Sequence, residues 1–463
     1  MKWKMIMTYL ACLLALVLIV SCAPGASPAP DPAPQETPAD PTEPEDETTA
    51  EATPDEDSVN ERTLTIYLPR ADEHEVYVLH YFAEAAYFEA ANPGLTFDFV
   101  MTGFSDFDTF FKTAVAANEQ IDLVEVNIQF YRDYVQRGFL SNITDRLDFD
   151  AVRLPEAAWD QMRYFSMDDY IYGVPLTMQL CAFYYNVEIF ERFGLDTPTT
   201  WDDVFAMQEI LAEEDIFPMV YAGAEHWWNG MHFNMVFYQF TNNNALAHND
   251  RLMAGDFSDE VLRPYIETFE FFARLENEGV LMPGTQGMDS LAARTAFTSG
   301  EAAMHFMGSW FAETLIAENP DFEFGVFPAP ILAGSGNISQ APGSVGDVWS
   351  VFSGSAYSDD AIAFIEHLVD PAVMSRFSAE AGNFVNIVIG AEGNNPIPQM
   401  AVFEEIAPST TIWLDAVWEP EIIQDFYMAI QSSILGDSTP TELMDAIVEH
   451  YIRLREQGRT FIP

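Results

Sequence analysis

Side chains that could bind a hydroxyl-rich molecule lie just after predicted strands and at the starts of predicted helices. The candidates for ligand binding are Asp72, Gln129, Gln179, Trp228, Trp310, Asp347 and Trp349. A sugar ring has apolar C–H faces and a rim of hydroxyls, so it calls for flat aromatic rings beside acids and amides. This combination favours binding of a neutral polar solute over chemistry performed on it.

Each of the nine Trp residues also has a simpler interpretation as a packing residue. Trp201 stands inside a helix-start pattern and is expected in the core. Trp310 favours binding, whereas for Trp228 and Trp349 both interpretations stay open. Trp413 and Trp418 precede the last predicted helices and favour packing.

Other constellations give weaker support for catalysis or metal binding. Asp122 and Glu125 lie in a predicted strand at a spacing that puts them on opposite faces. His226 and His232 lack the helical spacing that would bring two metal ligands together. Neither a phosphate-binding loop nor a dinucleotide fingerprint follows a strand. We therefore predict no catalytic residue, no metal and no cofactor.

The composition is strongly acidic, with 73 acids against 19 bases and a formal charge of −54. Such a surface repels phosphates, which argues against nucleic acid and anionic lipid as partners. We interpret the acidity as solvation in a salty or alkaline habitat, with a specific cation-binding role as the alternative.

The first residues are typical of a bacterial lipoprotein leader. Lys2 and Lys4 precede a short apolar run that ends in Ser21-Cys22. This predicts a signal peptide over 1–21 and lipidation of Cys22; an uncleaved anchor helix is the alternative. Residues 22–61 are acidic and rich in Pro, which predicts a disordered tether. Cys181 lies in an apolar strand and is expected to be a buried small hydrophobe.

Beyond the tether, predicted strands alternate with predicted helices. The pattern gives strands over 64–68, 96–100 and 121–126, with helices over 76–91 and 105–118 between them. This alternation predicts a parallel α/β sheet covered on both faces. Further on, the pattern predicts a strand over 181–185, helices over 187–193 and 200–215, and a turn at Gly343–Gly346.

Two ordered motifs resemble the family 1 extracellular solute-binding proteins, which include maltose-binding protein. The first is Tyr-Gly-x-Pro … Tyr-Tyr-Asn … Gly … Pro … Thr-Trp over Tyr172–Trp201. The second is Phe-x-x-Gly-x-Ala-Ala-Met … Gly-Ser-Trp, ending at Trp310. Weaker matches extend the resemblance over about residues 62 to 460. At Gln179 the resemblance implies a sugar-contacting carboxylate, and this chain has an amide instead.

The resemblance implies an α/β fold of the periplasmic-binding-protein type, class II, in which two lobes are joined by a hinge over a ligand cleft. We place the N-terminal lobe at 62–176 plus 329–372, and the C-terminal lobe at 177–328 plus 373–463. The implied partners are a small solute, expected to be a mono- or oligosaccharide, and the transmembrane subunits of an ABC permease. The protein is expected to act as a monomer on the extracellular face of the cytoplasmic membrane, held by its lipid anchor.

Two other function classes remain open from the sequence. One is a surface-anchored carbohydrate-active enzyme, which requires two acids facing each other across the cleft. The other keeps the fold but binds a polyamine, a metal chelate or a peptide. A run of cleft aromatics favours a sugar, and a cluster of cleft acids favours a cation.

Overall fold

The computed structural model describes residues 61–459, apart from 334–340, 383, 394 and 419. These residues belong to one compact unit, Val59–Pro463. The predicted signal peptide, Cys22 and nearly all of the tether lie outside the described residues. Within the described part, every helix is too short or too polar to cross a bilayer.

The described strands form a ten-stranded sheet whose main path runs β2-β1-β3-β8-β4-β6-β5. Their bounds are β1 Arg62–Leu68, β2 Leu95–Met101, β3 Leu123–Val126, β4 Val174–Asn186, β5 Phe217–Val220, β6 Ala302–Gly308, β7 Phe324–Phe327, β8 Ala341–Val351, β9 Val385–Asn386 and β10 Thr410–Thr411. β7 and β9 pair with β4, and β10 pairs with β8.

The parallel arrangement predicted from the first three strands is confirmed for β1, β2 and β3, but the sheet as a whole is mixed. β1 is parallel to β2 and β3, and β5 is parallel to β6. β8 runs antiparallel to both β3 and β4, and β4 runs antiparallel to β6. Strand propensity and alternation with helices revealed the strands, but the direction of β8 depends on a pairing with residues more than 200 positions earlier.

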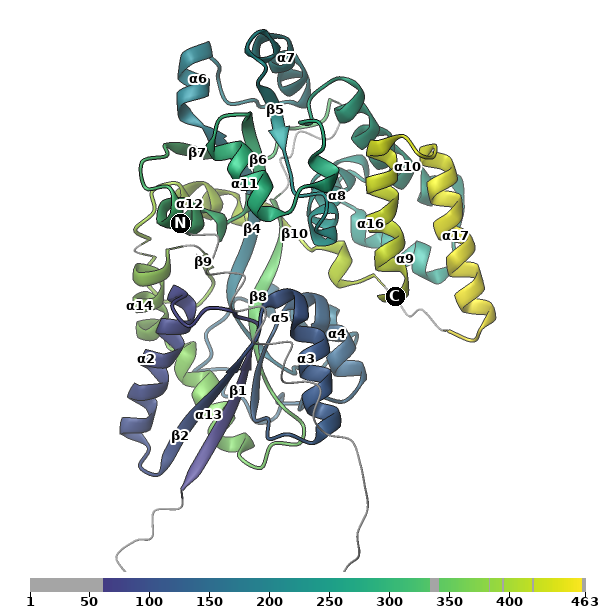
Figure 1. Ribbon diagram of the computed structural model, residues 1–463. Coiled ribbons are helices and arrows are strands. Elements are labelled where there is room, and N and C mark those ends of the chain that lie inside the picture. Colours follow the sequence, from purple (N-terminus) through teal and green to yellow (C-terminus); the bar gives the residue numbers. More distant parts are fainter. Residues whose placement is uncertain (1–60, 334–340, 383, 394, 419, 460–463) are drawn as a thin grey trace, which may run out of the picture. The chain divides into compact units, whose positions relative to one another are not determined.

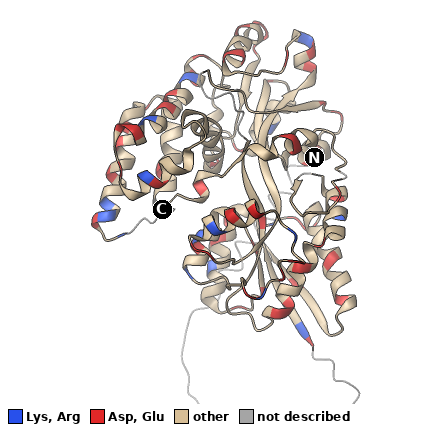
Figure 2. Ribbon diagram, turned by 180° about the vertical axis from the view of Figure 1, so that it is seen from behind, with Lys and Arg blue, Asp and Glu red and all other residues tan. Residues whose placement is uncertain are grey.

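Helices flank the strands throughout the described part of the chain. They are α2 Val76–Ala91, α3 Phe104–Ala117, α4 Ile128–Gln136, α5 Glu156–Ser166, α6 Val187–Phe193, α7 Trp201–Leu211, α8 His226–Phe240, α9 Ala245–Ala254, α10 Asp259–Asn277, α11 Ser290–Thr298, α12 Phe311–Glu318, α13 Ser358–Leu368, α14 Pro371–Ala381, α15 Met400–Ile406, α16 Pro420–Leu435 and α17 Pro440–Glu456. Figure 1 shows α2, α13 and α14 on one side of β1 and β2, and α3 and α4 on the other. Acidic residues are spread over the helices at both ends of the sheet (Figure 2).

Local sequence explains most helix boundaries. α6 ends at Gly194, which adopts the left-handed conformation that an L side chain disfavours. α7 begins with a capping box in which the Thr200 side chain accepts from the Asp203 N–H and the Asp203 carboxylate accepts from the Thr200 N–H. The predicted helix over 187–193 is confirmed residue for residue. The predicted strand over 181–185 is the second half of a longer strand.

That longer strand, β4, passes from one half of the sheet to the other. Val174–Leu180 pairs with β8, and Cys181–Asn186 pairs with β6 and β7. We call the part around β1, β2, β3, α2–α5, α13 and α14 the β1 region. The part around β5, β6, β7, α6–α12, α16 and α17 is the β6 region. The lower and upper halves of Figure 1 are these two regions.

The division of the chain into two lobes stays a prediction. α14 begins at Pro371 and packs against α2 of the β1 region. The predicted turn at Gly343–Gly346 is wrong, because these residues lie inside the continuous strand β8. The two glycines allow β8 to approach β4 closely and do not form a turn.

Candidate ligand-binding site

A pocket of about 720 Å³ lies where the β1 region faces the β6 region. Arg70 and Asp72 follow β1, Asp347 comes from β8, and Gln179 comes from the middle of β4. The opposite wall carries indole rings from α8, from the turn after β6 and from the segment after β10. The volume falls within the range of pockets that enclose small ligands. We call the first side the polar floor and the second side the aromatic wall.

Asp347 is the centre of the polar floor. Its Oδ1 accepts from Arg70 Nη2 at 2.9 Å and from Gln179 Nε2 at 3.3 Å, and its Oδ2 accepts from Thr177 Oγ1. Arg70 Nη2 also donates to Glu125 Oε1. Ionic hydrogen bonds of this kind are stronger than neutral ones, so the floor is fixed before a ligand arrives.

Two features of this floor depart from ordinary backbone and side-chain behaviour. Asp347 has φ of 48°, a left-handed conformation that is uncommon for a residue other than Gly. Burial raises the pKa of Glu125 to about 8, against the opposing effect of Arg70. Strained backbone and shifted pKa values occur together at functional sites more often than elsewhere.

The position of Gln179 depends on two glycines in the neighbouring strand. A Cβ on Gly346 would stand 2.7 Å from Gln179 Cδ, and a Cβ on Gly343 would stand 2.3 Å from the Gln179 carbonyl oxygen. The absence of side chains at both positions lets β8 approach β4 closely. It also leaves the Gln179 amide turned toward Asp347.

Three indole rings form the aromatic wall: Trp227, Trp310 and Trp413. The Trp310 ring lies 6.4 Å from that of Trp227 and 6.2 Å from that of Trp413, measured between centroids. Trp227 and Trp310 are half-buried, whereas Trp413 is buried, with 7% of its surface exposed. Contiguous indoles of this kind offer the apolar faces on which a sugar ring can lie.

The turn that presents Trp310 is held by β4. Ser309 N donates to the Leu180 carbonyl at 2.8 Å, and the Tyr184 hydroxyl donates to the Gly308 carbonyl at 2.9 Å. The indole folds back over Gly308, where an added Cβ would stand 2.1 Å from Trp310 Cη2. Gly308 is therefore required for the present position of the ring.

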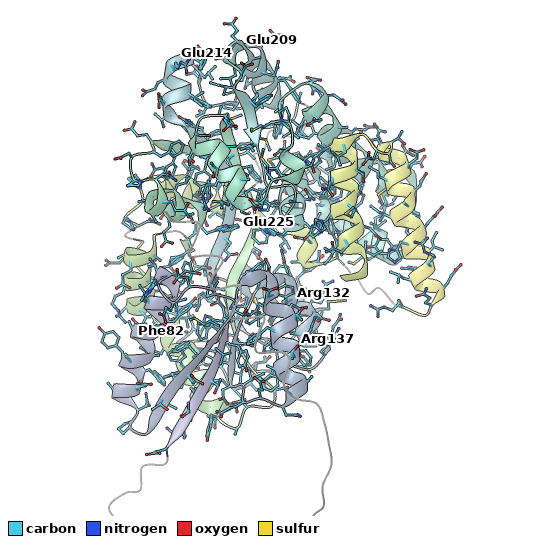
Figure 3. The ribbon with its side chains drawn as sticks, in the orientation of Figure 1. Phe82, Arg132, Arg137, Glu209, Glu214 and Glu225 are labelled. Atoms are coloured by element: carbon cyan, nitrogen blue, oxygen red, sulfur yellow. The ribbon has the colours of Figure 1, made fainter. Side chains whose placement is uncertain are left out.

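Glu225 fixes the second indole. Its Oε2 accepts from Trp227 Nε1 at 3.1 Å, and its Oε1 accepts from Ser290 N at 2.6 Å. Figure 3 labels Glu225 between the upper and lower halves of the molecule. The carboxylate thus ties the start of α8 to the start of α11.

Five of the seven candidates line this pocket. They are Asp72, Gln129, Gln179, Trp310 and Asp347. Asp72 is exposed and accepts from His74 N at 2.9 Å. Gln129 stands in the first turn of α4, where Asn127 caps the helix by accepting from Gln129 N at 3.0 Å.

The other two candidates, Trp228 and Trp349, lie in the core and not on the pocket wall. Both are 0% exposed. Trp228 stacks on His305 at 4.9 Å and donates to Ser290 Oγ at 3.2 Å. Trp349 packs edge-on against Tyr81 at 4.9 Å. Successive residues of a helix point about 100° apart. Trp228 therefore points into the core while its neighbour Trp227 faces the pocket.

Sequence reasoning gave too little weight to three pocket residues. Arg70, two residues after β1, and Trp227, in the first turn of α8, are not among the seven candidates. Trp413 is expected from the sequence to be a packing residue, but it lines the pocket. The sequence signal for all three was their place next to an element end. Their grouping arises from chain segments hundreds of residues apart.

The other residues considered for catalysis or metal binding are held by hydrogen bonds or buried in the core. Asp122 Oδ2 accepts from Thr65 N at 2.9 Å, away from Glu125. His232 is buried, with Nδ1 2.8 Å from the Trp228 carbonyl, and burial lowers its pKa to about 3. Cys181 is fully buried, as expected, and burial raises the pKa of its thiol.

Fold and pocket together define a class, the α/β binding proteins of the periplasmic type, in which a pocket forms where two sheet regions face each other. The family model for the bacterial extracellular solute-binding proteins matches residues 71–375. The chain belongs to this family, whose members bind solutes and are not enzymes.

Named relatives and solved structures agree with this assignment. The chain is 24% identical over 364 residues to the multiple sugar-binding protein of Streptococcus mutans, covering 75% of this chain and 81% of that protein. A chitin oligosaccharide binding protein superposes with a TM-score of 0.73 at 20% identity, covering 85% of this chain and 98% of the other. The solute-binding protein RafE in complex with raffinose gives a TM-score of 0.68 at 21% identity, covering 84% and 98%.

Proposed function

We propose that this protein is the saccharide receptor of an ABC importer, which captures an oligosaccharide in the pocket and delivers it to a membrane permease. The observation that carries this is the pairing of three contiguous indoles with a preorganised polar floor in one pocket. Relatives named for sugar binding support the same ligand class. The permease is inferred from the family alone.

The polar floor and the aromatic wall would contact different faces of one ligand. Asp347, Gln179 and Asp72 offer acceptors and donors for hydroxyls, and Trp310 and Trp227 offer stacking surfaces. A ligand that touches both sides binds the closed arrangement of the two regions more tightly than an open one, so it shifts the population toward closure. A micromolar affinity corresponds to about −8 kcal/mol, which exceeds the ~5.5 kcal/mol needed to invert a 1:99 equilibrium.

The first test is a thermal-shift screen of residues 61–463 against raffinose, chitin oligosaccharides and maltotriose, followed by calorimetry on each hit. We expect at least one saccharide to raise Tm, because a ligand that binds only the folded state stabilises it. No shift with any saccharide, together with a shift by spermidine, would instead identify a polyamine receptor.

The second test replaces Trp310 by Ala. Loss of a central aromatic contact costs about 2 kcal/mol or more, so we expect affinity to fall ~30-fold or more. Trp201→Phe is the control, because Trp201 is 1% exposed in the core and outside the pocket. Unchanged affinity in Trp310→Ala with a folded protein would remove the aromatic wall from the binding site.

We further propose that Cys22 carries the lipid and that residues 22–61 hold the binding domain away from the membrane. The support is the leader pattern that ends in Ser21-Cys22 and the acidic Pro-rich stretch after it. Replacing Cys22 by Ser should release the protein from cells into the medium and abolish labelling by a fatty-acid analogue. Retention of the label in Cys22→Ser would place the anchor elsewhere.

The acids on the pocket wall make a cationic solute the second candidate. Asp72, Glu75 and Glu313 all line the pocket. The three indoles weigh against a small inorganic cation, since hydrated ions gain little from an indole face. Spermidine is therefore the cationic probe in the screen, and an enzymatic function is set aside because the family consists of binding proteins.

A further inference from the structure

The charge balance of the pocket wall is strongly one-sided. The described acids that line it are Asp72, Glu75, Glu225, Glu313, Glu318 and Asp347. The described bases that line it are Arg70 and His74. This imbalance follows that of the whole chain, which has 73 acids against 19 bases, and at the pocket wall it acts on any ligand that carries a charge of its own.

Arg70 offers no net positive charge to a ligand. Its guanidinium pairs with Asp347 at 2.9 Å and also with Glu125, and both carboxylates are nearly fully buried. Because burial raises the pKa of Glu125 to about 8, the three groups together are neutral when Glu125 holds its proton. They carry one negative charge when it does not. An anionic ligand therefore meets a cation that is already matched.

Two acids of the wall, Glu225 and Asp72, have neutral hydrogen-bond donors as partners. Glu225 accepts from Trp227 Nε1 and from Ser290 N, and both donors are neutral. Asp72 accepts from a backbone N–H. Glu318 differs, because Arg294 pairs with it at 2.8 Å. Glu75 is half-buried at the start of α2 and stands near enough to Glu125 to affect its titration. Hydrogen bonds from neutral donors orient a carboxylate without cancelling its charge.

We propose that this pocket selects saccharides by charge: it rejects sugars that bear a carboxylate, sulfate or phosphate and favours those that bear an amine. The inference rests on the proposed saccharide function and goes beyond it by naming the chemical class. At physiological salt, charges beyond the ~8 Å Debye length are largely screened, so the wall acids outweigh the remote surface. A protonated amine gains a further attraction at the faces of Trp227 and Trp310.

The test uses two matched ligand series in which only the charged group changes. The first is raffinose with the C6 hydroxyl of its terminal galactose kept, replaced by an amine or oxidised to a carboxylate. The second is cellotriose, chitotriose and cellotriouronic acid, which share one β-1,4 backbone. We expect the carboxylates to bind at least 10-fold more weakly than the neutral parent, and the amines several-fold more tightly. Both differences should shrink between 20 mM and 500 mM NaCl.

A matched pair of variants distinguishes the effect of a charge in the pocket from the effect of the protein's net charge. Glu75→Gln removes one negative charge from the wall, and Glu209→Gln removes one from the exposed face of α7, far from the pocket (Figure 3). We expect Glu75→Gln to narrow the gap between the amine and carboxylate ligands about three-fold, and Glu209→Gln to leave it unchanged. Thermal unfolding of both variants checks that each is folded.

The outcomes distinguish failure of this inference from failure of the proposed function. A carboxylate ligand that binds as tightly as its neutral parent overturns the charge selection and leaves saccharide binding in place. Equal effects of the two variants overturn the role of the wall acids. Absence of binding by every member of both series, together with no saccharide hit in the thermal-shift screen, overturns the proposed function and the inference together.

Discussion

The two sides of the pocket hold their side chains by different means. On the polar floor, hydrogen bonds join Arg70, just after β1, and Asp347, inside β8, to Thr177 and Gln179 of β4. On the aromatic wall, the rings of Trp227 and Trp310 are placed by backbone contacts, by one carboxylate and by packing. The floor is therefore part of what keeps the β1 region folded, whereas the wall faces are largely available to a ligand. Substitutions should separate the two.

The largest effect is expected on the floor, from Arg70→Met. This change leaves the buried Asp347 and Glu125 without their cation, and breaking one side of a buried pair costs about 3–5 kcal/mol. Urea unfolding should show a loss of stability of this order along with weaker ligand binding. A stability within 1 kcal/mol of the parent protein would contradict a structural role for the network.

Two adjacent tryptophans give the sharpest contrast on the wall. Trp228→Ala removes a fully buried side chain and should lower the free energy of unfolding by about 3–5 kcal/mol. Trp227→Ala removes a half-buried ring at the pocket, and we expect weaker saccharide binding with less than half of that loss in stability. Thermal unfolding checks the ranking in stability, and unchanged saccharide affinity of Trp227→Ala by calorimetry would show that the pocket lies elsewhere.

The floor should also respond to pH in a way the wall does not. The folded protein keeps a proton on Glu125 up to a pKa of about 8, while the unfolded chain loses it near 4.5. Because the folded state binds more protons in this window, its stability falls as pH rises toward 8. Between pH 6.5 and 8 the change is at most about 2 kcal/mol.

Glu125→Gln should flatten that part of the stability profile, since Gln cannot ionise. The groups that face Glu125 are Arg70 after β1, Asp347 on β8 and Glu75 at the start of α2. Glu209→Gln serves as the exposed control and should keep the parent slope. Parallel slopes for the parent protein and Glu125→Gln would show that another group carries the proton.

The smallest effect is expected from Gly308→Ala. The added methyl would stand 2.1 Å from Trp310 Cη2, so the indole must move from its present position. Such overpacking costs about 1–3 kcal/mol, and part of it should appear as weaker ligand binding and a shifted Trp fluorescence maximum. Gly287→Ala has open space and no positive φ, and should change neither readout.

Local sequence was sufficient for several of the elements and for the class of site. The expected helix over 76–91 coincides with α2, and the helix over 187–193 coincides with α6, because caps and periodicity act within a few residues. The expectation that the folded part belongs to the solute-binding family is confirmed by the family match. Five of seven candidate residues line the pocket. Asp72, Gln129 and Trp310 do so because each follows the end of a strand, whereas Gln179 and Asp347 lie inside β4 and β8.

The charge pairing of the polar floor and the directions of the Trp rings could not be predicted, because they depend on contacts between residues far apart in the sequence. Arg70 and Asp347 are 277 positions apart, so nothing near Arg70 signals that its charge is matched. Trp228 and Trp349 differ from Trp227 and Trp310 only in the direction each ring takes from its element, and that direction depends on what packs beside it. The left-handed backbone of Asp347 within a strand also has no local signature.

The bare backbone of β8 opposite Gln179 has a consequence for how ligand preference could change over time. Gly346 leaves the space that the Gln179 side chain occupies, because a Cβ there would stand 2.7 Å from Gln179 Cδ. Glutamate has the same outline and would fit the same space, but it would place a second carboxylate against Asp347 where the amide now donates a hydrogen bond. An exchange of amide for acid at this position would therefore change the charge of the polar floor rather than its shape.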